Sequence, residues 1–271
     1  MTFDDSTSSS EMDFVISSEM PTGYIPRDYE EFPEFCFFKP YEGPVYPRRD
    51  WVELIELQRA RYKTSPLLVH QHNKIEPMNQ GAFGYCWMYS IIGAVLNRYA
   101  AQGIDPVPNL SAHAVAAMHK EYRNEGGFCI EAAHALQKLG APTSEVWPGY
   151  SMDKRLEENR AVVESRKLHR LVDFQEHARE RVFEETMSAM ICPVNPSPVA
   201  VAFSWWRHAV AALAGTYRKR GRRIEFGIEF VNSYGDKWNG RRRGYGTVWG
   251  TKAIPFESVT VRAVSAVSEE K

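Results

Sequence analysis

The sequence predicts an α+β protein with two lobes, in which a helical N-terminal half precedes a β-rich C-terminal half. Two patterns support this class. Between residues 86 and 191 apolar residues recur at helical spacing, and Gly and Pro separate the segments. After Pro198 the pattern changes to period-two, β-rich runs. We expect the two halves to pack as separate lobes with a cleft between them.

The helical half has recognisable helix ends. Gly103 ends the apolar helix that begins at Cys86, Ser111 is a typical N-cap, and Gly140 with Pro142 ends a third helix. Asp50 precedes a further short helix. The expected helices span residues 51–62, 86–101, 111–120, 130–139, 152–167 and 176–191. The expected strands span residues 199–203, 209–217, 224–231, 245–249 and 259–267.

The chain divides into a body with two dissimilar ends. Residues 1–23 are acidic and Ser-rich without periodicity, which predicts a disordered tail. Residues 24–50 are rich in Pro and aromatic residues and are expected to lie extended across the folded body. Residues 51–267 form the predicted domain, with a helical lobe at about 75–190 and a β lobe at about 195–267. Residues 268–271 form a short tail.

Composition excludes several classes of protein. The chain has 271 residues, 44% hydrophobic and 25% charged, with a formal net charge of −1. This balance argues against a dedicated nucleic-acid or membrane-surface binder. No apolar stretch is long enough to span a membrane, and the N-terminus lacks the pattern of a secretory signal. Four cysteines without C-x-x-C spacing favour a reduced, cytoplasmic protein without a thiolate zinc site.

The first candidate for chemistry is Cys86, which follows a Gly-containing loop and begins a predicted helix. The first N–H groups of a helix are unpaired, and the helix dipole favours negative charge there. A thiol at this position is therefore expected to ionise more easily, and the thiolate is the nucleophilic form. The Cys86 amide and the Gln80 side chain are candidate donors to an oxyanion. A lone buried cysteine is more often a small apolar residue, so a base is needed.

His208 and Asn232 are the candidate partners of Cys86. His208 lies at the start of an apolar strand, and Asn232 follows it by 24 positions in Asn-Ser-Tyr-Gly. An Asn amide can fix the tautomer and orientation of an imidazole, so the three residues make a nucleophile, a base and an orienter. Taken separately, His208 could also be a core histidine whose hydrogen bonds are satisfied by neighbouring groups. Asn232 alone could be the cap of a turn.

These residues lie in short motifs that resemble those of papain-like cysteine peptidases. His208 follows Cys86 by 122 positions and Asn232 follows it by 146, near the family spacing of about 130–150. The resemblance covers roughly residues 65–255. Over this range the sequence is similar to papain-like proteins of phages and bacteria. The motifs are Asn79-Gln80-Gly81 with Cys86-Trp87, His208-Ala209-Val210, Asn232-Ser233-Tyr234-Gly235 and Gly244-Tyr245-Gly246.

The resemblance implies a papain-like fold, with an antiparallel β-barrel-like C-terminal lobe and the active site in the cleft. It assigns Cys86 as nucleophile, His208 as base, Asn232 as orienter and Gln80 as oxyanion donor. The sequence departs from the family at several positions. Phe83 stands where the family has a disulfide cysteine, and Tyr234 stands where it has Trp. No inhibitory pro-helix pattern is found, so activation by removal of a pro-peptide is not implied.

Three functions remain open at this point. The first is a cysteine-type peptide hydrolase, with a protein or peptide as substrate and no cofactor or metal. The second is a catalytically silent scaffold on the same fold, for example a virion-associated protein, in which the aromatic strip occupies the groove or a partner surface. The third is a thiol transpeptidase, amidase or deubiquitinase-like enzyme.

Several other residues have a structural reading that competes with a functional one. Cys36, Cys129 and Cys192 are expected to be inert. His70 and His72 would share a face on a strand and could hold a metal, although a surface pair is the simpler reading. Trp205 and Trp206 line the cleft or pack in the core. The basic runs 218–223 and 241–243 are expected to be exposed hairpin turns, with which the acidic N-terminus could pair.

Overall fold

A seven-stranded sheet runs through the molecule, whose residues 11–61 and 65–266 are described by a computed structural model. The strand order is β1-β2-β7-β3-β4-β5-β6. Neighbouring strands are antiparallel, except that β1 and β2 are parallel. The strands are β1 (Lys39–Pro40), β2 (His169–Glu176), β3 (Val199–Phe203), β4 (His208–Arg220), β5 (Arg223–Val231), β6 (Tyr245–Trp249) and β7 (Glu257–Ala266).

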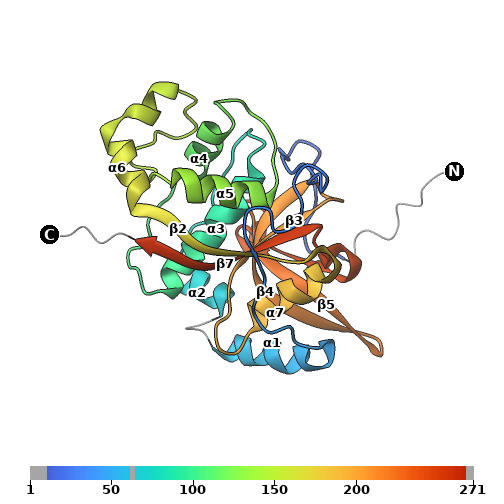
Figure 1. The fold of residues 1–271 in the computed structure, drawn as a ribbon. Coiled ribbons are helices and arrows are strands. Elements are labelled where there is room, and N and C mark those ends of the chain that lie inside the picture. Colours follow the sequence, from blue (N-terminus) through green and yellow to red (C-terminus); the bar gives the residue numbers. More distant parts are fainter. Residues whose placement is uncertain (1–10, 62–64, 267–271) are drawn as a thin grey trace.

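The helices lie in two groups. Figure 1 shows α3 to α6 gathered on one side of the molecule, with α1 and α7 beside β4 and β5 on the other. Every helix within residues 11–61 and 65–266 is too short or too polar to cross a lipid bilayer. The α-helices are α1 (Trp51–Ala60), α2 (Pro66–His72), α3 (Cys86–Ala101), α4 (Ala112–His119), α5 (Cys129–Leu139), α6 (Arg160–Leu168) and α7 (Val182–Ile191).

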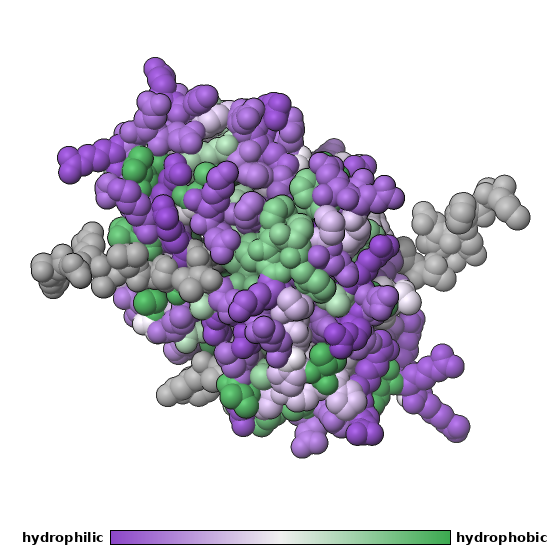
Figure 2. Space-filling model, viewed as in Figure 1, coloured by the Kyte–Doolittle hydropathy of each residue, from purple (hydrophilic) through white to green (hydrophobic). Residues whose placement is uncertain are grey.

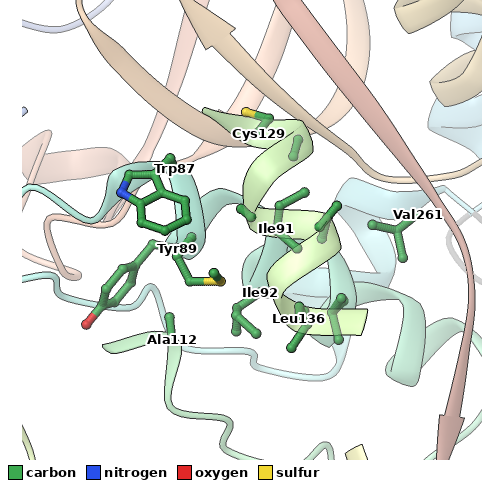
Figure 3. Packing of buried hydrophobic residues seen from close by; sticks show 14 of the residues in the cluster. Trp87, Tyr89, Ile91, Ile92, Ala112, Cys129, Leu136 and Val261 are labelled. Carbon is green, nitrogen blue, oxygen red and sulfur yellow. The ribbon is translucent and has the colours of Figure 1, made fainter. Parts of the chain in front are cut away.

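The two faces of β3 separate two hydrophobic cores. Ala200 and Ala202 face the first core, which surrounds α3, whereas Val199, Val201 and Phe203 face the second core under α1 and α7. This alternation follows from the period of two in a strand. Figure 3 shows the first core, where Ile91 and Ile92 of α3 lie near Leu136 of α5 and Val261 of β7. The predicted α+β class, with a helical N-terminal region followed by antiparallel strands, is therefore confirmed.

Small residues let α3 approach the sheet closely. A Cβ atom built on Gly93 would lie 3.0 Å from the Cβ of Ala211 on β4. Such a contact is tighter than ordinary van der Waals packing, so a larger residue at either position would push the helix away. Because α3 begins at Cys86 and β4 begins at His208, this contact also determines how close the two ends lie.

The observed elements match most of the predicted ones and add two. The structure has α3 at residues 86–101 and β3 at residues 199–203, as predicted, and the Ser111 hydroxyl accepts a hydrogen bond from Ala114 N at 3.1 Å as an N-cap. Besides the two-residue β1, two elements were not predicted: α2, which has seven residues, and β2, which ends at Glu176. The helix expected over residues 176–191 is shorter than predicted, because α7 begins only at Val182. The stretch 152–167 is a 3₁₀ helix, Lys154–Glu158, followed by α6.

Residues 11–25 make specific contacts, although the sequence predicts a disordered tail up to residue 23. Met12 pairs with Val248 at the outer edge of β6, and Phe14 packs on Trp206 and Trp238. The remainder of the predicted tail, residues 1–10, lies outside the described residues, as do residues 268–271. A tail rich in Ser and Asp can therefore still bind where a few residues find complementary partners.

The Pro and aromatic strip lies across the body without long regular elements, as its composition predicts. Its only strand is the two-residue β1, within the described residues. Its aromatic side chains Phe32, Phe35, Phe37 and Phe38 are partly exposed. In the view of Figure 1 the N-terminal segment crosses the middle of the molecule, and Figure 2 shows apolar colouring gathered near the centre of the same face.

Candidate active site

Cys86 is the first residue of α3 and is completely buried. Burial raises the pKa of its thiol to about 11, and nearby backbone N–H groups of Ala209, Gly23, Trp87 and Tyr24 oppose that rise. Amides that point at a sulfur stabilise its anionic form, whereas the loss of water destabilises it more strongly here. In this state the thiol is therefore protonated at neutral pH.

His208 is buried at the start of β4 and is oriented by Asn232. Its Nε2 lies 2.7 Å from Asn232 Oδ1, and the same oxygen accepts a hydrogen bond from Ser233 N at 2.7 Å. Burial is the main cause that lowers the pKa of His208 to about 4, while the bond to Asn232 opposes the change. The imidazole is therefore neutral at neutral pH, with its proton on Nε2.

The second ring nitrogen of His208 contacts a tyrosine. Its Nδ1 lies 3.2 Å from the Tyr234 hydroxyl, and the two rings stack with centroids 4.7 Å apart. Within residues 11–61 and 65–266, no hydrogen bond joins the Cys86 thiol to His208. The thiol nevertheless lies beside the backbone of Ala209, the next residue along β4. Cys86, His208 and Asn232 thus converge, with Tyr234 at the nitrogen that a thiol would use.

Gln80 lies in the same cluster and is held by the residue after Asn232. Its Oε1 accepts a hydrogen bond from Ser233 Oγ at 2.5 Å, and its backbone N–H donates to Ser233 O at 2.8 Å. Its Nε2 donates to Phe83 O at 2.7 Å and to Pro21 O at 3.1 Å. The loop before α3 and the loop after β5 are therefore linked through Gln80 and Ser233.

The chain's own residues 21–25 lie between the backbones of Gly127 and Arg207, beside Cys86 and Gln80. Gly127 N donates to Gly23 O at 2.9 Å, and Ile25 N donates to Gly127 O at 3.0 Å. On the other wall, Tyr24 N donates to Arg207 O at 3.2 Å. Both walls therefore hold an extended backbone by main-chain hydrogen bonds, a form of recognition that depends little on side chains. The aromatic strip expected to occupy the groove begins at residue 24, so the observed segment, residues 21–25, includes only its first two residues.

The side chain of Tyr24 lies over a buried carboxyl group. Burial is the main cause that raises the pKa of the Tyr24 hydroxyl, and the charges of Glu257 and Cys129 add to it. Glu257 accepts a hydrogen bond from Cys129 N, and burial raises the pKa of its carboxyl to about 7. In the described residues neither the Tyr24 hydroxyl nor Glu257 Oε2 has a hydrogen-bond partner. No sequence pattern singled out Glu257.

Ion pairs anchor the chain before and after residues 21–25. Arg27, which is buried, pairs with the buried Glu176 at the end of β2. Asp13 pairs with Arg242, and its carboxylate also accepts a hydrogen bond from Thr247 N at 2.7 Å. The second pair agrees with the expectation that the acidic N-terminus contacts a basic run. The run 241–243 therefore does not form a simple exposed turn, whereas residues 220–223 do form an exposed hairpin end.

The other histidines, tryptophans and cysteines considered in the sequence make contacts typical of packing. His70 and His72 lie on α2 and not on a strand, and buried His70 bonds Tyr245 Oη at 2.7 Å. The described residues contain no group of three or more side chains arranged to hold a metal ion. Trp206 is buried against His208, with ring centroids 4.6 Å apart, and the more exposed Trp205 stacks on it. All four cysteines are free, and only Cys36 is exposed.

Comparison with solved structures identifies the class of fold. No family model matches the sequence, and no curated protein sequence matches it either. Solved structures do match, and they show that the chain has the fold of papain-like cysteine proteases.

Three of these structures illustrate the likeness. Digestive procathepsin L 3 from the larval midgut of Tenebrio molitor is 17% identical, with 88% of this chain and 82% of that chain covered and a TM-score of 0.56. The Carica candamarcensis protease CMS1MS2 in complex with E-64 is 18% identical, with 72% and 96% covered and a TM-score of 0.52. Xylellain, a cysteine protease from Xylella fastidiosa, is 12% identical, with 92% and 99% covered and a TM-score of 0.50. At these identities the likeness concerns the fold.

Proposed function

We propose that the protein is a cysteine-type peptide hydrolase whose cleft is closed by its own N-terminal segment in the state described. The observation that carries the proposal is the main-chain recognition of residues 21–25 beside Cys86, His208 and Gln80. A cleft that holds one extended backbone through the Arg207 carbonyl and both main-chain groups of Gly127 is suited to hold another. The substrate class is therefore a protein or peptide.

The reaction follows from the roles of the three residues. Cys86 transfers its proton to His208, and the thiolate attacks the scissile carbonyl carbon to form a C–S bond. Gln80 and the Cys86 amide stabilise the oxyanion. His208 then gives the proton to the leaving amine as the C–N bond breaks. Water, with His208 as base, hydrolyses the thioester and restores the thiol.

The neutral state of the covered site explains why the segment must move first. Burial raises the pKa of Cys86 and lowers that of His208, so transfer of a proton between them is unfavourable while water is excluded. Departure of residues 21–25 would hydrate both groups and move both pKa values back toward their ordinary range. Opening of the cleft is thus expected both to admit substrate and to favour the ion pair.

A second candidate, a silent scaffold, is favoured by the same occupation. A Cys86 side chain with no exposed surface, covered by the protein itself, is what a non-catalytic papain-like protein would show. Fold alone does not decide between the two. The difference lies in whether the segment can leave and whether the thiol is then activated.

A thiol transpeptidase or amidase would share the first chemical step with the hydrolase and would be recognised by transfer to an added amine.

The test uses a variant that displaces the segment without changing the catalytic candidates. A Cβ atom at Gly23 would lie 1.8 Å from the carbonyl oxygen of Gly84, so Gly23→Ala forces the two backbones apart, and we expect residues 21–25 to be displaced. We expect an epoxide-type thiol-protease inhibitor to label Cys86 at least about tenfold faster in Gly23→Ala than in wild type. Intact-mass spectrometry with peptide mapping measures the adduct, and cleavage of an unfolded protein substrate measures hydrolysis.

Two controls make the result interpretable. Thr22→Ala changes an exposed side chain in the same segment and should label at the wild-type rate. Cys86→Ala should lose both the adduct and hydrolysis while it keeps the fold. If Gly23→Ala folds and its Cys86 reacts with iodoacetamide but not with the epoxide, the thiol is accessible without being activated and the scaffold is the correct function.

A further inference from the structure

The carbonyl oxygen of Pro21 shows where a peptide carbonyl is held in this site. Gln80 Nε2 donates to it from 3.1 Å and Tyr234 Oη from 2.9 Å. Gln80 is fixed in this orientation by Ser233, the neighbour of Tyr234. The carbonyl oxygen therefore lies between two donors, of which the tyrosine hydroxyl has no counterpart among the sequence-predicted site residues.

The Tyr234 hydroxyl has two acceptors within reach and only one proton. Besides Pro21 O, it lies 3.2 Å from His208 Nδ1. His208 Nε2 faces Asn232 Oδ1, an oxygen that already accepts from a backbone N–H, so Nε2 carries a proton in either charge state. The charge state of His208 therefore decides whether Nδ1 accepts or donates, and Tyr234 must adapt.

The two charge states give two directions for the tyrosine proton. With His208 neutral, Nδ1 is an acceptor and competes with the peptide carbonyl for the Tyr234 O–H. With His208 protonated, Nδ1–H donates to the tyrosine oxygen, and the tyrosine proton is available only to the carbonyl. Burial raises the pKa of Tyr234, so the hydroxyl keeps its proton in both states.

We propose that Tyr234 is a further catalytic residue, which donates a hydrogen bond to the substrate carbonyl oxygen beside Gln80 when His208 is protonated. This inference rests on the proposed peptide hydrolase. Transfer of the Cys86 proton to His208 then does two things at once, because it makes the thiolate and directs the tyrosine proton toward the carbonyl. As the C–S bond forms, negative charge collects on that oxygen between the two donors, and Tyr234 itself neither gains nor loses a proton.

The ring and the hydroxyl of Tyr234 have separable roles. The ring stacks on His208 and meets the edge of Trp238, with centroids 6.1 Å apart. Tyr234→Phe keeps both ring contacts and removes only the hydroxyl. A purely packing role therefore predicts little change in that variant, whereas a donor to an oxyanion is typically worth about 10²–10³-fold in rate.

The experiment compares two probes with the same dipeptide portion on full-length protein that carries Gly23→Ala. A peptidyl aldehyde forms a hemithioacetal with an oxyanion, whereas an epoxysuccinyl peptide reacts with the thiolate without one. We expect Tyr234→Phe to lower the ratio of aldehyde affinity to epoxide rate constant by about 100-fold. Tyr150→Phe is the matched control, since its hydroxyl bonds Asn79 O at 2.9 Å outside the carbonyl position, and its ratio should stay unchanged.

The outcomes separate this inference from the proposed function. An unchanged ratio in Tyr234→Phe, in a preparation where Gln80→Ala lowers it, would overturn the role of Tyr234 and leave the hydrolase standing. Failure of both probes to modify Cys86 in the parent protein would overturn the hydrolase and this inference with it. Tyr234→Met, which fills a comparable volume and has no N–H or O–H donor on its side chain, is the second variant if Tyr234→Phe does not fold, and the same loss is expected.

Discussion

Two buried histidines, His177 and His208, differ in what surrounds them although burial lowers the pKa of both, to about 3 and about 4. His177 contacts hydroxyl groups of Thr186, Ser258 and Thr260, which come from α7 and β7, at distances between 2.6 and 3.1 Å. These hydroxyl groups belong to packed elements, and Tyr41 covers the ring edge to face with centroids 4.9 Å apart, so the buried ring completes a core.

His208 has partners of another kind. The side-chain oxygen of Asn232 contacts one ring nitrogen, and the Tyr234 hydroxyl contacts the other. The Tyr234 hydroxyl also donates a hydrogen bond to the carbonyl oxygen of Pro21. Pro21 belongs to a segment that also covers Cys86. Burial and a lowered pKa therefore do not distinguish a functional histidine from a structural one. The distinguishing feature is that part of the surroundings of His208 comes from a segment outside the seven-stranded sheet.

The largest expected effect is the loss of catalysis in His208→Ala. In the Gly23→Ala background, we expect hydrolysis of a protein substrate to fall by about 10³-fold or more, because Cys86 loses its base. Circular dichroism checks that the variant is folded. Near-normal turnover in a folded His208→Ala protein would show that His208, like His177, has only a structural role.

The converse variant, His177→Ala, should change stability and not chemistry. Removing the ring leaves a cavity and three hydroxyl groups with fewer partners, so we expect the free energy of unfolding to fall by about 3 kcal/mol. Urea unfolding measures the change. Epoxide labelling per folded molecule should match the parent protein, and a labelling rate that fell with a stable fold would show that His177 also serves the site.

Glu257 offers a smaller effect, because its carboxyl group is buried and one of its oxygens has no hydrogen-bond partner among residues 11–61 and 65–266. Its pKa is raised from 4.5 to about 7, so between these values the unfolded chain ionises before the folded one. The free energy of unfolding should therefore fall as the pH rises from about 4.5 to 7, by an amount on the order of 2–3 kcal/mol. Glu257→Gln keeps an acceptor for Cys129 N and should lose this decline in urea titrations at pH 5 and pH 8.

A decline of equal size in the Gln variant would place its origin elsewhere. The alternative groups are Glu176 and Glu185, whose pKa values are also raised by burial. Glu185→Gln, on α7 and remote from the cleft segment, is the matched control for a buried carboxyl group that does not contact Tyr24.

Local signals were enough to predict most of the fold. The apolar spacing after Cys86, the Ser111 cap and the uninterrupted β-rich run at 199–203 each depend on residues close in sequence, and the structure follows them. Strand β2 was missed because its sequence, His-Arg-Leu-Val-Asp-Phe-Gln-Glu, mixes charges with apolar residues and gains its pairing from β7, far along the chain. Tertiary pairing thus overrode a weak local preference.

The sequence predicts which residues make up the candidate site, but it does not predict that another segment of the chain covers them. Gln80, Cys86, His208 and Asn232 were chosen from their order and spacing, and the structure brings them to one place. Sequence order says nothing about which segment fills the cleft, because the contacts of residues 21–25 with Gly127 and Arg207 are made by main-chain atoms. The hydroxyl of Tyr234 was likewise visible only as a departure from the Trp of the family.

The close approach of Gly93 and Ala211 has a consequence for how such a protein can vary. The contact lies two helical turns after Cys86 and three residues after His208, and it contains no polar atom. It acts as a spacer of fixed thickness between the two halves, so the loops that line the cleft can differ in length and composition without altering the separation of sulfur and imidazole. We therefore expect the loops at the rim to tolerate substitutions that this apolar contact does not. A single methyl group added at the contact, far from any reacting atom, would be enough to change the separation of the Cys86 sulfur and the His208 imidazole.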